Sequence, residues 1–430
     1  MQSDNRRYIP LLDVLRAGAA LWVVLYHVVI HLVPAGEASR TLVGADNPVT
    51  IVLSQGWLAV SLFVMLSGYS LSLGLTKGEI IWGAYLKARW LRVAPLYLVI
   101  LMIGLLATPL SRRPSIDSFL AAMTMLPVPD AFLPRPWLST AWSVKVELVL
   151  YLFIPVLVYA ARRYKPLTTV AMCGALGLVL FLALHPTTSV VDILYWGIPG
   201  RLVEFTVGFA LGYAGRAIAV RLRKPAIGVG VAGFLVMTFV ANRAGGFHGM
   251  SGTTRIALYI ATIALAGLLL AAIDQRPKAS ASRVVAGVSA VGSWSYSTYL
   301  WHMIVIKLLM VPLLPALTRT FGVSGGLAVA MSITVAVVMV LSWASFNMIE
   351  RPFLSLRPKY VRDVPEKTGP VAALVAAEER PTARTPVHHT AGPLARALNE
   401  TGMRARPAVP VAREAQLERT NESVGAGGRS

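Results

Sequence analysis

The chain has 430 residues, of which 56% are hydrophobic and only 14% are charged. A water-soluble protein of this length carries roughly twice that share of charged residues, so the composition excludes an ordinary soluble domain. It predicts an all-α, polytopic integral membrane protein.

The formal net charge of +20 is distributed in a way that excludes nucleic acid as the partner. Residues 357–430 hold 12 basic and 8 acidic residues, so 28 basic and 12 acidic residues remain in the apolar part of the chain. There the excess of Lys and Arg lies mostly in short loops between apolar segments, which is typical of membrane topology signals. The partner that this pattern indicates is the lipid bilayer.

Ten segments are apolar and long enough to cross about 30 Å of hydrocarbon as helices. They lie near residues 10–33, 56–75, 93–110, 142–161, 167–184, 198–215, 225–242, 254–273, 294–313 and 325–347. The loops alternate in charge, since one set holds 16 Lys and Arg and the other set holds 7. Because the richer set faces the cytoplasm, we expect both the N- and the C-terminus to be cytoplasmic. The number of spans is then even, in agreement with about ten transmembrane helices.

The first span carries ionisable groups that a lipid-facing helix would avoid. Arg16 and His27 are eleven residues apart, which is about three turns and about 16 Å of rise, so both lie on one helix face. Asp13 precedes Arg16 by three residues and can pair with it. A neutral imidazole can accept a proton from a hydroxyl and return it to a leaving group, which makes His27 the candidate general base. The alternative for His27 is a structural hydrogen bond between helices.

Two arginines stand at the predicted cytoplasmic start of the third span. Arg89 and Arg92 are three residues apart in the stretch KARWLRVAPLY. A pair of guanidinium groups can bind phosphates through bidentate hydrogen bonds. The competing interpretation is an ordinary pair of cationic membrane anchors, and the spacing alone leaves both open.

The fourth and sixth spans contain acidic residues. Glu147 lies in WSVKVELVLYLFIP and is a candidate member of a polar site inside the membrane. Arg201 and Glu204 are three residues apart, and we expect them to form a structural ion pair. Gly208 and Gly212 have the spacing that lets membrane helices approach closely.

No sequence motif points to a metal or to a bound nucleotide. The chain has one cysteine and contains neither a P-loop nor H-E-x-x-H, so we expect no metal. Residues 322–326, GVSGG, fit the G-x-S-x-G pattern of serine hydrolases. That pattern requires a strand-to-helix turn, whereas here it begins an apolar helix, so we interpret it as a chance match.

Taken together, these segments resemble the acyltransferase type 3 family, polytopic enzymes that O-acylate bacterial polysaccharides and other glycosylated products. Each stretch alone is a weak match, and their common order over residues 8–353 makes the resemblance specific. The matching stretches are IPLLDVLRAGAALWVVLYHV, GWLAVSLFVMLSGYSLSL, KARWLRVAPLY, WSVKVELVLYLFIP, GRLVEFTVGFALGY, SYSTYLWH and IERPF.

The resemblance implies an acyl-CoA donor that enters from the cytoplasm, with acetyl-CoA as the expected one. It also implies an acceptor hydroxyl on a carbohydrate or glycosylated product. The family's functional residues map onto His27 and Arg16 as catalytic residues and onto Arg89 and Arg92 as donor-binding residues. Glu147 also matches, and we include it in the catalytic group.

The resemblance divides the chain into two parts. Residues 1–353 form the expected membrane acyltransferase domain of the inner (plasma) membrane, and the match closes on IERPF with Glu350, whose role stays open. Residues 354–430 are rich in Pro, Ala, Arg, Glu and Gly without a hydrophobic period. This composition predicts a cytoplasmic, largely disordered tail.

The alternative function is a proton-coupled transporter or exporter of a polysaccharide or small solute. Intramembrane His, Arg and Glu residues also build proton relays in such proteins. Many transporters contain internal repeats, however, and the two halves of this chain show no convincing repeat. A membrane O-acyltransferase is therefore the leading prediction, with direct transfer and a two-step acyl relay both open.

Overall fold

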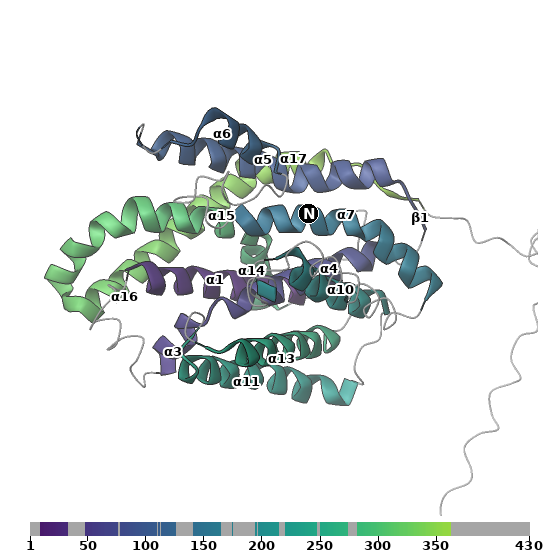
Figure 1. Ribbon diagram of the computed structural model, residues 1–430, viewed down its shortest axis with the longest axis horizontal. Helices are drawn as coiled ribbons and strands as arrows, with labels where there is room; N and C mark the ends of the chain where they lie inside the picture. Colours follow the sequence, from purple (N-terminus) through teal and green to yellow (C-terminus); the bar gives the residue numbers. More distant parts are fainter. Residues whose placement is uncertain are drawn as a thin grey trace, which may run out of the picture. The chain divides into compact units, whose positions relative to one another are not determined.

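The computed structural model describes residues 9–32, 48–75, 78–109, 111, 113–125, 141–164, 174, 194–195, 197–214, 220–246, 250–273 and 282–362 (Figure 1). The described residues all belong to one compact unit, Met1–Val364. Most of the predicted tail lies outside the described residues. Its described part, 354–362, begins inside the last helix and ends in a short strand.

Helices make up nearly all of the described part of this unit. The long ones are α1 (Pro10–Leu32), α4 (Leu58–Leu75), α5 (Trp82–Ala107), α7 (Ala141–Arg163), α10 (Ile198–Ala214), α11 (Val220–Arg243), α13 (Gly252–Ala271), α15 (Ser295–Val305) and α16 (Val311–Ser345). The shorter ones are α3 (Pro48–Ser54), α6 (Ile116–Met123), α14 (Arg283–Ser293) and α17 (Arg351–Ser355), with two π-helical turns, η3 (Ile306–Met310) and η4 (Phe346–Glu350).

The described residues contain seven helices that are long and apolar enough to cross a membrane. They confirm the predicted all-α, polytopic membrane protein. The span expected at 167–184 lies almost entirely outside the described residues. The count of ten and the position of the two termini therefore stay predictions.

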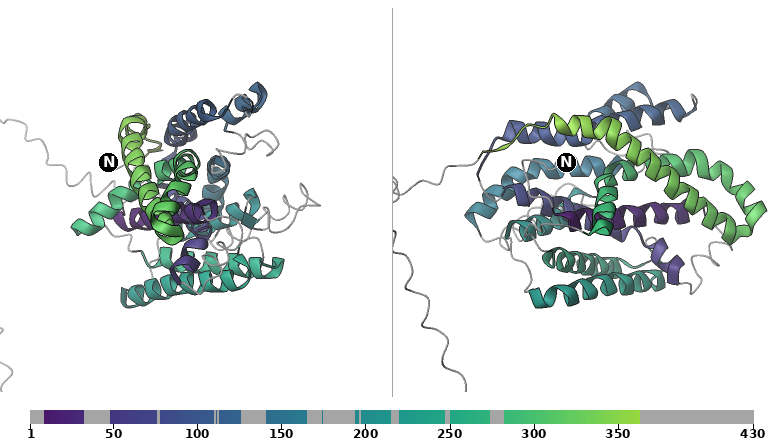
Figure 2. Two further views of the ribbon diagram at one scale, coloured as in Figure 1. Left: turned by 90° about the vertical axis from the view of Figure 1, so that its left-hand side faces the viewer. Right: turned by 180° about the vertical axis from the view of Figure 1, so that it is seen from behind.

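The C-terminal helical segment, Ser295–Ser355, contains two arms joined at Gly322. The backbone of Gly322 has φ 73° and ψ 173°, a combination that only glycine adopts readily. Both views show α16 as a hairpin whose second arm returns alongside the first (Figures 1 and 2). The spans predicted at 294–313 and 325–347 correspond to these two arms.

The most extensive helix contact among the described residues joins α4 to α10. A Cβ atom added to Gly68 would lie 2.1 Å from the Phe205 carbonyl oxygen, and one added to Gly208 would lie 2.1 Å from the Met65 carbonyl oxygen. A Cβ at Gly212 would meet the Ser72 hydroxyl. The close approach predicted from Gly208 and Gly212 is thus present, because the two backbones touch where side chains are missing.

Two contacts join parts of the chain that are far apart in the sequence. The short helix α14 crosses α1, where Gly292 packs against the backbone of Asp13 (Figure 2). Antiparallel strands β1 (Glu79–Ile80) and β2 (Val361–Arg362) form a two-residue ribbon, a small exception to the all-α prediction. The ribbon fastens Tyr360 beside the start of α5, since the Ile81 amide donates a hydrogen bond to the Tyr360 carbonyl at 2.9 Å.

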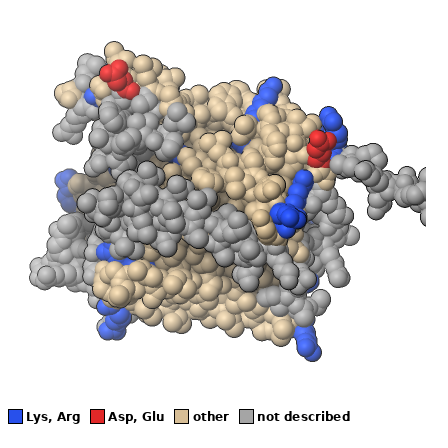
Figure 3. All heavy atoms as spheres, turned by 45° about the vertical axis from the view of Figure 1, so that its right-hand side comes forward, with Lys and Arg blue, Asp and Glu red and all other residues tan. Residues whose placement is uncertain are grey.

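Charged side chains leave a broad uncharged surface between the helix ends. Figure 3 shows Lys and Arg gathered mainly toward two ends of the described surface, with mostly uncharged residues between them. Many exposed residues of the described helices are large and apolar. Such a band is the surface that a bilayer requires.

Candidate active site

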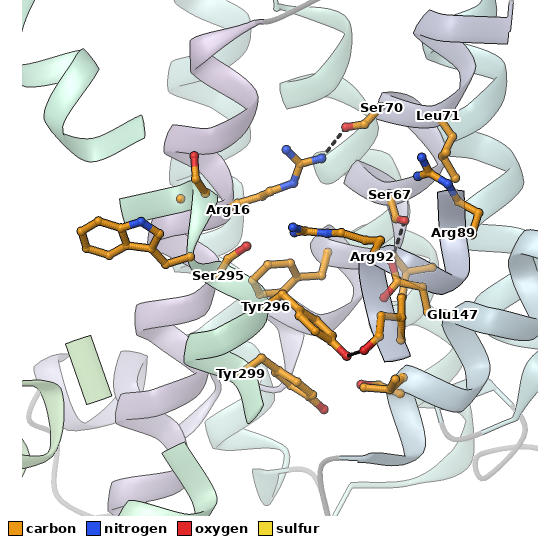
Figure 4. A pocket seen from close by; sticks show the side chains of 18 of the residues that line it. Arg16, Ser67, Ser70, Leu71, Arg89, Arg92, Glu147, Ser295, Tyr296 and Tyr299 are labelled. Carbon is orange, nitrogen blue, oxygen red and sulfur yellow. Dashed lines mark hydrogen bonds between the residues drawn. The ribbon is translucent and has the colours of Figure 1, made fainter. Parts of the chain in front are cut away.

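A cavity of about 650 Å³ lies between the central helices. Side chains from α1, α4, α5, α7, α10, α14, α15 and α17 line it, together with Tyr360 from the segment after α17. Figure 4 shows three of the predicted arginines, Arg16, Arg89 and Arg92, with Glu147 around this common space. The volume is in the range of ordinary ligand pockets.

The cavity is strongly cationic. Among the described residues that line it, six are arginines and two are acidic. The arginines are Arg16, Arg89, Arg92, Arg201, Arg351 and Arg357, and the acids are Asp13 and Glu147. Guanidinium groups stay charged at every physiological pH, so the cavity favours anionic ligands.

Arg16 is held in place by two neighbours. Its guanidinium group forms an ion pair with Asp13 at 2.5 Å and donates a hydrogen bond to the Ser70 hydroxyl at 2.5 Å. The pairing predicted from the three-residue spacing is therefore present. Figure 4 shows the end of Arg16 pointing toward that of Arg92.

Arg89 lies within a cage of aromatic rings. The carbon of its guanidinium group is 5.7 Å from the ring centres of Tyr85 and Tyr151 and 5.5 Å from that of Tyr360. Its Nε atom is buried and makes no hydrogen bond within the part of the chain that the structure describes. Cation–π contacts stabilise the charge but leave donor groups available to an anion.

Arg92 contacts the motif IERPF near the end of the membrane domain. It forms an ion pair with Glu350 at 3.0 Å, and the Ser297 hydroxyl donates to the other oxygen of that carboxylate. The Arg92 side chain keeps 27% of its surface accessible, whereas Glu350 keeps 1%. Glu350, whose role was open in the sequence, therefore orients a cavity arginine.

Helix α5 begins about three turns before the predicted start of the third span. The hydropathy pattern placed Arg89 and Arg92 just before the helix, at 93, whereas α5 begins at Trp82. Both arginines lie inside the helix because an acid and several tyrosines from distant segments surround them. Such partners are invisible in a local hydropathy average.

Glu147 faces the cavity from α7. Its carboxylate accepts a hydrogen bond from the Ser67 hydroxyl at 3.0 Å and another from the Tyr151 hydroxyl, one turn along the same helix. Tyr151 is also part of the cage around Arg89. Glu147 thereby fixes one wall of the arginine site.

The other predicted ion pair, in α10, is present as a structural contact. Arg201 and Glu204 are 2.7 Å apart, and both side chains are almost fully buried. Arg201 also donates to the Tyr195 carbonyl and to the Ser61 hydroxyl. With its guanidinium group saturated in this way, Arg201 contributes charge to the cavity wall rather than a free donor.

His27 does not line the cavity. Its ring lies against His302 of α15, with 4.8 Å between ring centres, and stacks on His31 at 6.0 Å. Its Nδ1 atom bonds to the Val23 carbonyl at 2.9 Å. A carbonyl only accepts, so Nδ1 carries the proton and Nε2 is the basic atom.

Several cavity residues were not predicted from the sequence. Arg351, Arg357, Tyr296 and Tyr299 line the cavity, although neither charge nor spacing singled them out. The stretch SYSTYLWH did carry a signal, because its tyrosines and His302 recur every three residues along one helix face.

The arrangement supports chemistry on an anionic ligand. It combines a cationic cavity, an ordered carboxylate and, near one end of α1, an imidazole with a basic Nε2 atom. A family model described as an acyltransferase domain matches residues 9–343. The chain belongs to the acyltransferase type 3 family. This membership favours an enzyme over the alternative of a proton-coupled transporter.

Relatives of this acyltransferase are found in Staphylococcus aureus. O-acetyltransferase OatA of strain NCTC 8325 is 24% identical over 408 residues, covering 86% of this chain and 61% of the relative. SACOL0978 of strain COL, named an O-acetyltransferase by inference, is 25% identical over 399 residues, covering 83% of this chain and 60% of the relative. The acyltransferase thus spans about 60% of the length of these relatives. No solved structure matches it.

Proposed function

We propose that this acyltransferase is an O-acetyltransferase of the inner (plasma) membrane. It transfers an acetyl group from acetyl-CoA to a hydroxyl of a carbohydrate or glycosylated acceptor. The names of its relatives support the O-acetyl group. The observation that best supports acetyl-CoA as the donor is the arginine-lined cavity. Coenzyme A is a polyanion, and guanidinium groups bind its phosphates well.

Donor binding is assigned to Arg89 and Arg92. The two guanidinium groups face one cavity from neighbouring turns of α5, and neither is saturated. Arg351 from α17 and Arg357 from the segment after it add positive charge to the lining. A donor that brings several phosphates offsets the mutual repulsion of these cations.

The catalytic group follows from the chemistry of thioester attack. The Nε2 atom of His27 removes the proton of the acceptor hydroxyl as the oxygen attacks the acyl carbon. Arg16 lies about 16 Å along α1 toward the donor side, and its charge can hold the donor or steady negative charge on the acyl oxygen. Glu147 acts as a positioning residue through Ser67 and Tyr151.

The separation between cavity and base suits the shape of the donor. The phosphates occupy the arginine-lined cavity, and the extended pantetheine arm carries the thioester along α1 toward His27. Ten transmembrane helices with both termini in the cytoplasm place the donor entrance on the cytoplasmic side. The acceptor then reaches His27 from the outer half of the bilayer.

The direct test is donor affinity in purified protein reconstituted into lipid nanodiscs. We expect the double variant Arg89→Gln with Arg92→Gln to raise the acetyl-CoA KM by at least about tenfold, since each removes a charged hydrogen-bond donor. The matched control is Arg221→Gln with Lys224→Gln, which removes two exposed charges from α11. An unchanged acetyl-CoA KM in the first double variant contradicts the assignment and makes these arginines membrane anchors.

A further inference from the structure

The predicted base belongs to a row of three rings that leads back to the cavity. Tyr299 lines the cavity, and its ring centre is 5.5 Å from that of His302. The ring centre of His302 is in turn 4.8 Å from that of His27. His302 therefore contacts both the wall of the cavity and the base on α1.

His302 is unusual among buried histidines. Its side chain is fully buried, and neither ring nitrogen makes a hydrogen bond of normal geometry to the described residues. The backbone carbonyls of Thr298 and Tyr299 lie near the ring without meeting hydrogen-bond geometry. Buried polar atoms are nearly always hydrogen-bonded, so a ring with two such atoms calls for a functional explanation.

The reaction requires a proton to move from the acceptor hydroxyl to the leaving group, and the three rings lead from His27 to the cavity. The acceptor hydroxyl loses its proton to His27, whereas the leaving group is the thiolate of coenzyme A, which gains one. With Nδ1 bonded to Val23, His27 has one ring nitrogen for both tasks. A second imidazole with two available nitrogens can accept a proton on one and release it from the other.

We propose that His302 is a second catalytic residue that relays the proton from His27 to the leaving thiolate. This inference rests on the proposed thioester donor. The acceptor oxygen forms a bond to the acyl carbon, and its proton passes to Nε2 of His27. The carbon–sulfur bond breaks, and the thiolate takes a proton from one nitrogen of His302 as the other nitrogen receives the proton from His27. The products are the ester and free thiol, and both histidines end neutral.

Two donors with different leaving groups separate this role from a structural one. Acetyl-CoA releases a basic thiolate that needs a proton, whereas para-nitrophenyl acetate releases a stable phenolate that does not. In nanodiscs with a fixed acceptor, we expect His302→Gln to lower turnover with acetyl-CoA by about 100-fold and with para-nitrophenyl acetate by less than about threefold. His27→Ala should lower turnover with both donors, because the acceptor must be deprotonated in either case.

His31 provides a matched control, because it also stacks on His27. His31→Gln removes the exposed ring stacked on the other side of His27, and we expect it to leave both rates unchanged. Equal loss with the two donors in His302→Gln, or no loss with acetyl-CoA, overturns the relay. If wild-type protein transfers acetyl from neither donor, the proposed function fails as well.

The wild-type protein provides a test that does not depend on a variant folding. A relay to the leaving group makes turnover nearly independent of leaving-group basicity across a series of acetyl thioesters. A steep rise in turnover as the leaving thiol becomes more acidic contradicts the relay.

Discussion

At the scale of single residues, the site is built from charges that constrain one another. Arg92 is oriented by Glu350, and Arg89 is enclosed by three tyrosines, one of which is fixed by Glu147. Buried ion pairs contribute little net stability compared with apolar packing, but removing one partner is costly. These contacts therefore serve chiefly to hold cationic groups at defined positions in an apolar protein.

Glu350→Gln should separate stability from donor affinity. Loss of the carboxylate leaves Arg92 without its ion partner, so we expect the free energy of unfolding to fall by about 1–3 kcal/mol. The acetyl-CoA KM should also fall, because Arg92 becomes fully available to phosphate. Arg92→Gln should lower stability as well but raise the KM. Thermal unfolding and initial rates measure both quantities, and an unchanged KM in Arg92→Gln contradicts a donor role for Arg92.

At the scale of helices, the pair α4 and α10 forms the scaffold on which the cavity is built. α4 contributes Ser67 and Ser70, which bind Glu147 and Arg16, and α10 contributes Arg201. Their backbones touch at Gly68 and Gly208. A change in the separation of these two helices would displace several cavity residues together.

Gly208→Ala tests this scaffold against a matched glycine. The added methyl group would lie 2.1 Å from the Met65 carbonyl oxygen, so the helices must move apart. We expect loss of folded protein or a clear fall in thermal midpoint, together with loss of activity. Gly228→Ala on α11 meets nothing within 4 Å and should be neutral or slightly stabilising, by up to about 1 kcal/mol. Equal behaviour of the two variants would argue against close packing.

The sequence predicted helices better than the partners of their polar residues. Spacing within one helix was sufficient for Asp13 with Arg16 and for Arg201 with Glu204. It could not reveal that Glu350 lies beside Arg92, 258 positions earlier in the chain. Contacts of this kind depend on tertiary packing, which local periodicity does not encode.

At the scale of the whole molecule, the orientation of the chain in the membrane decides how the substrates arrive. The donor model requires the arginine-lined cavity to open toward the cytoplasm, and the asymmetry of Lys and Arg between loops predicts that orientation. The same orientation places His27 nearer the outer face. Topology is therefore a property on which the proposed reaction depends.

Single cysteines test the orientation directly. The chain's one cysteine, Cys173, is first replaced by alanine. In that background, Ser282→Cys lies in a loop expected to be cytoplasmic. Thr253→Cys lies in a loop expected outside, and both positions are exposed. A membrane-impermeant maleimide should label only Thr253→Cys in intact cells and both variants after permeabilisation. Labelling of Ser282→Cys in intact cells would contradict the predicted orientation.

The most direct test of acyl transfer at the membrane is mass spectrometry of surface glycans and glycosylated metabolites. Cells with the wild-type gene should carry products heavier by one acetyl group than cells without it. Cells with His27→Ala should lack this increment while containing the same amount of folded protein in the membrane. An acetyl increment that persists in His27→Ala, or no mass difference between cells with and without the wild-type gene, would contradict the account.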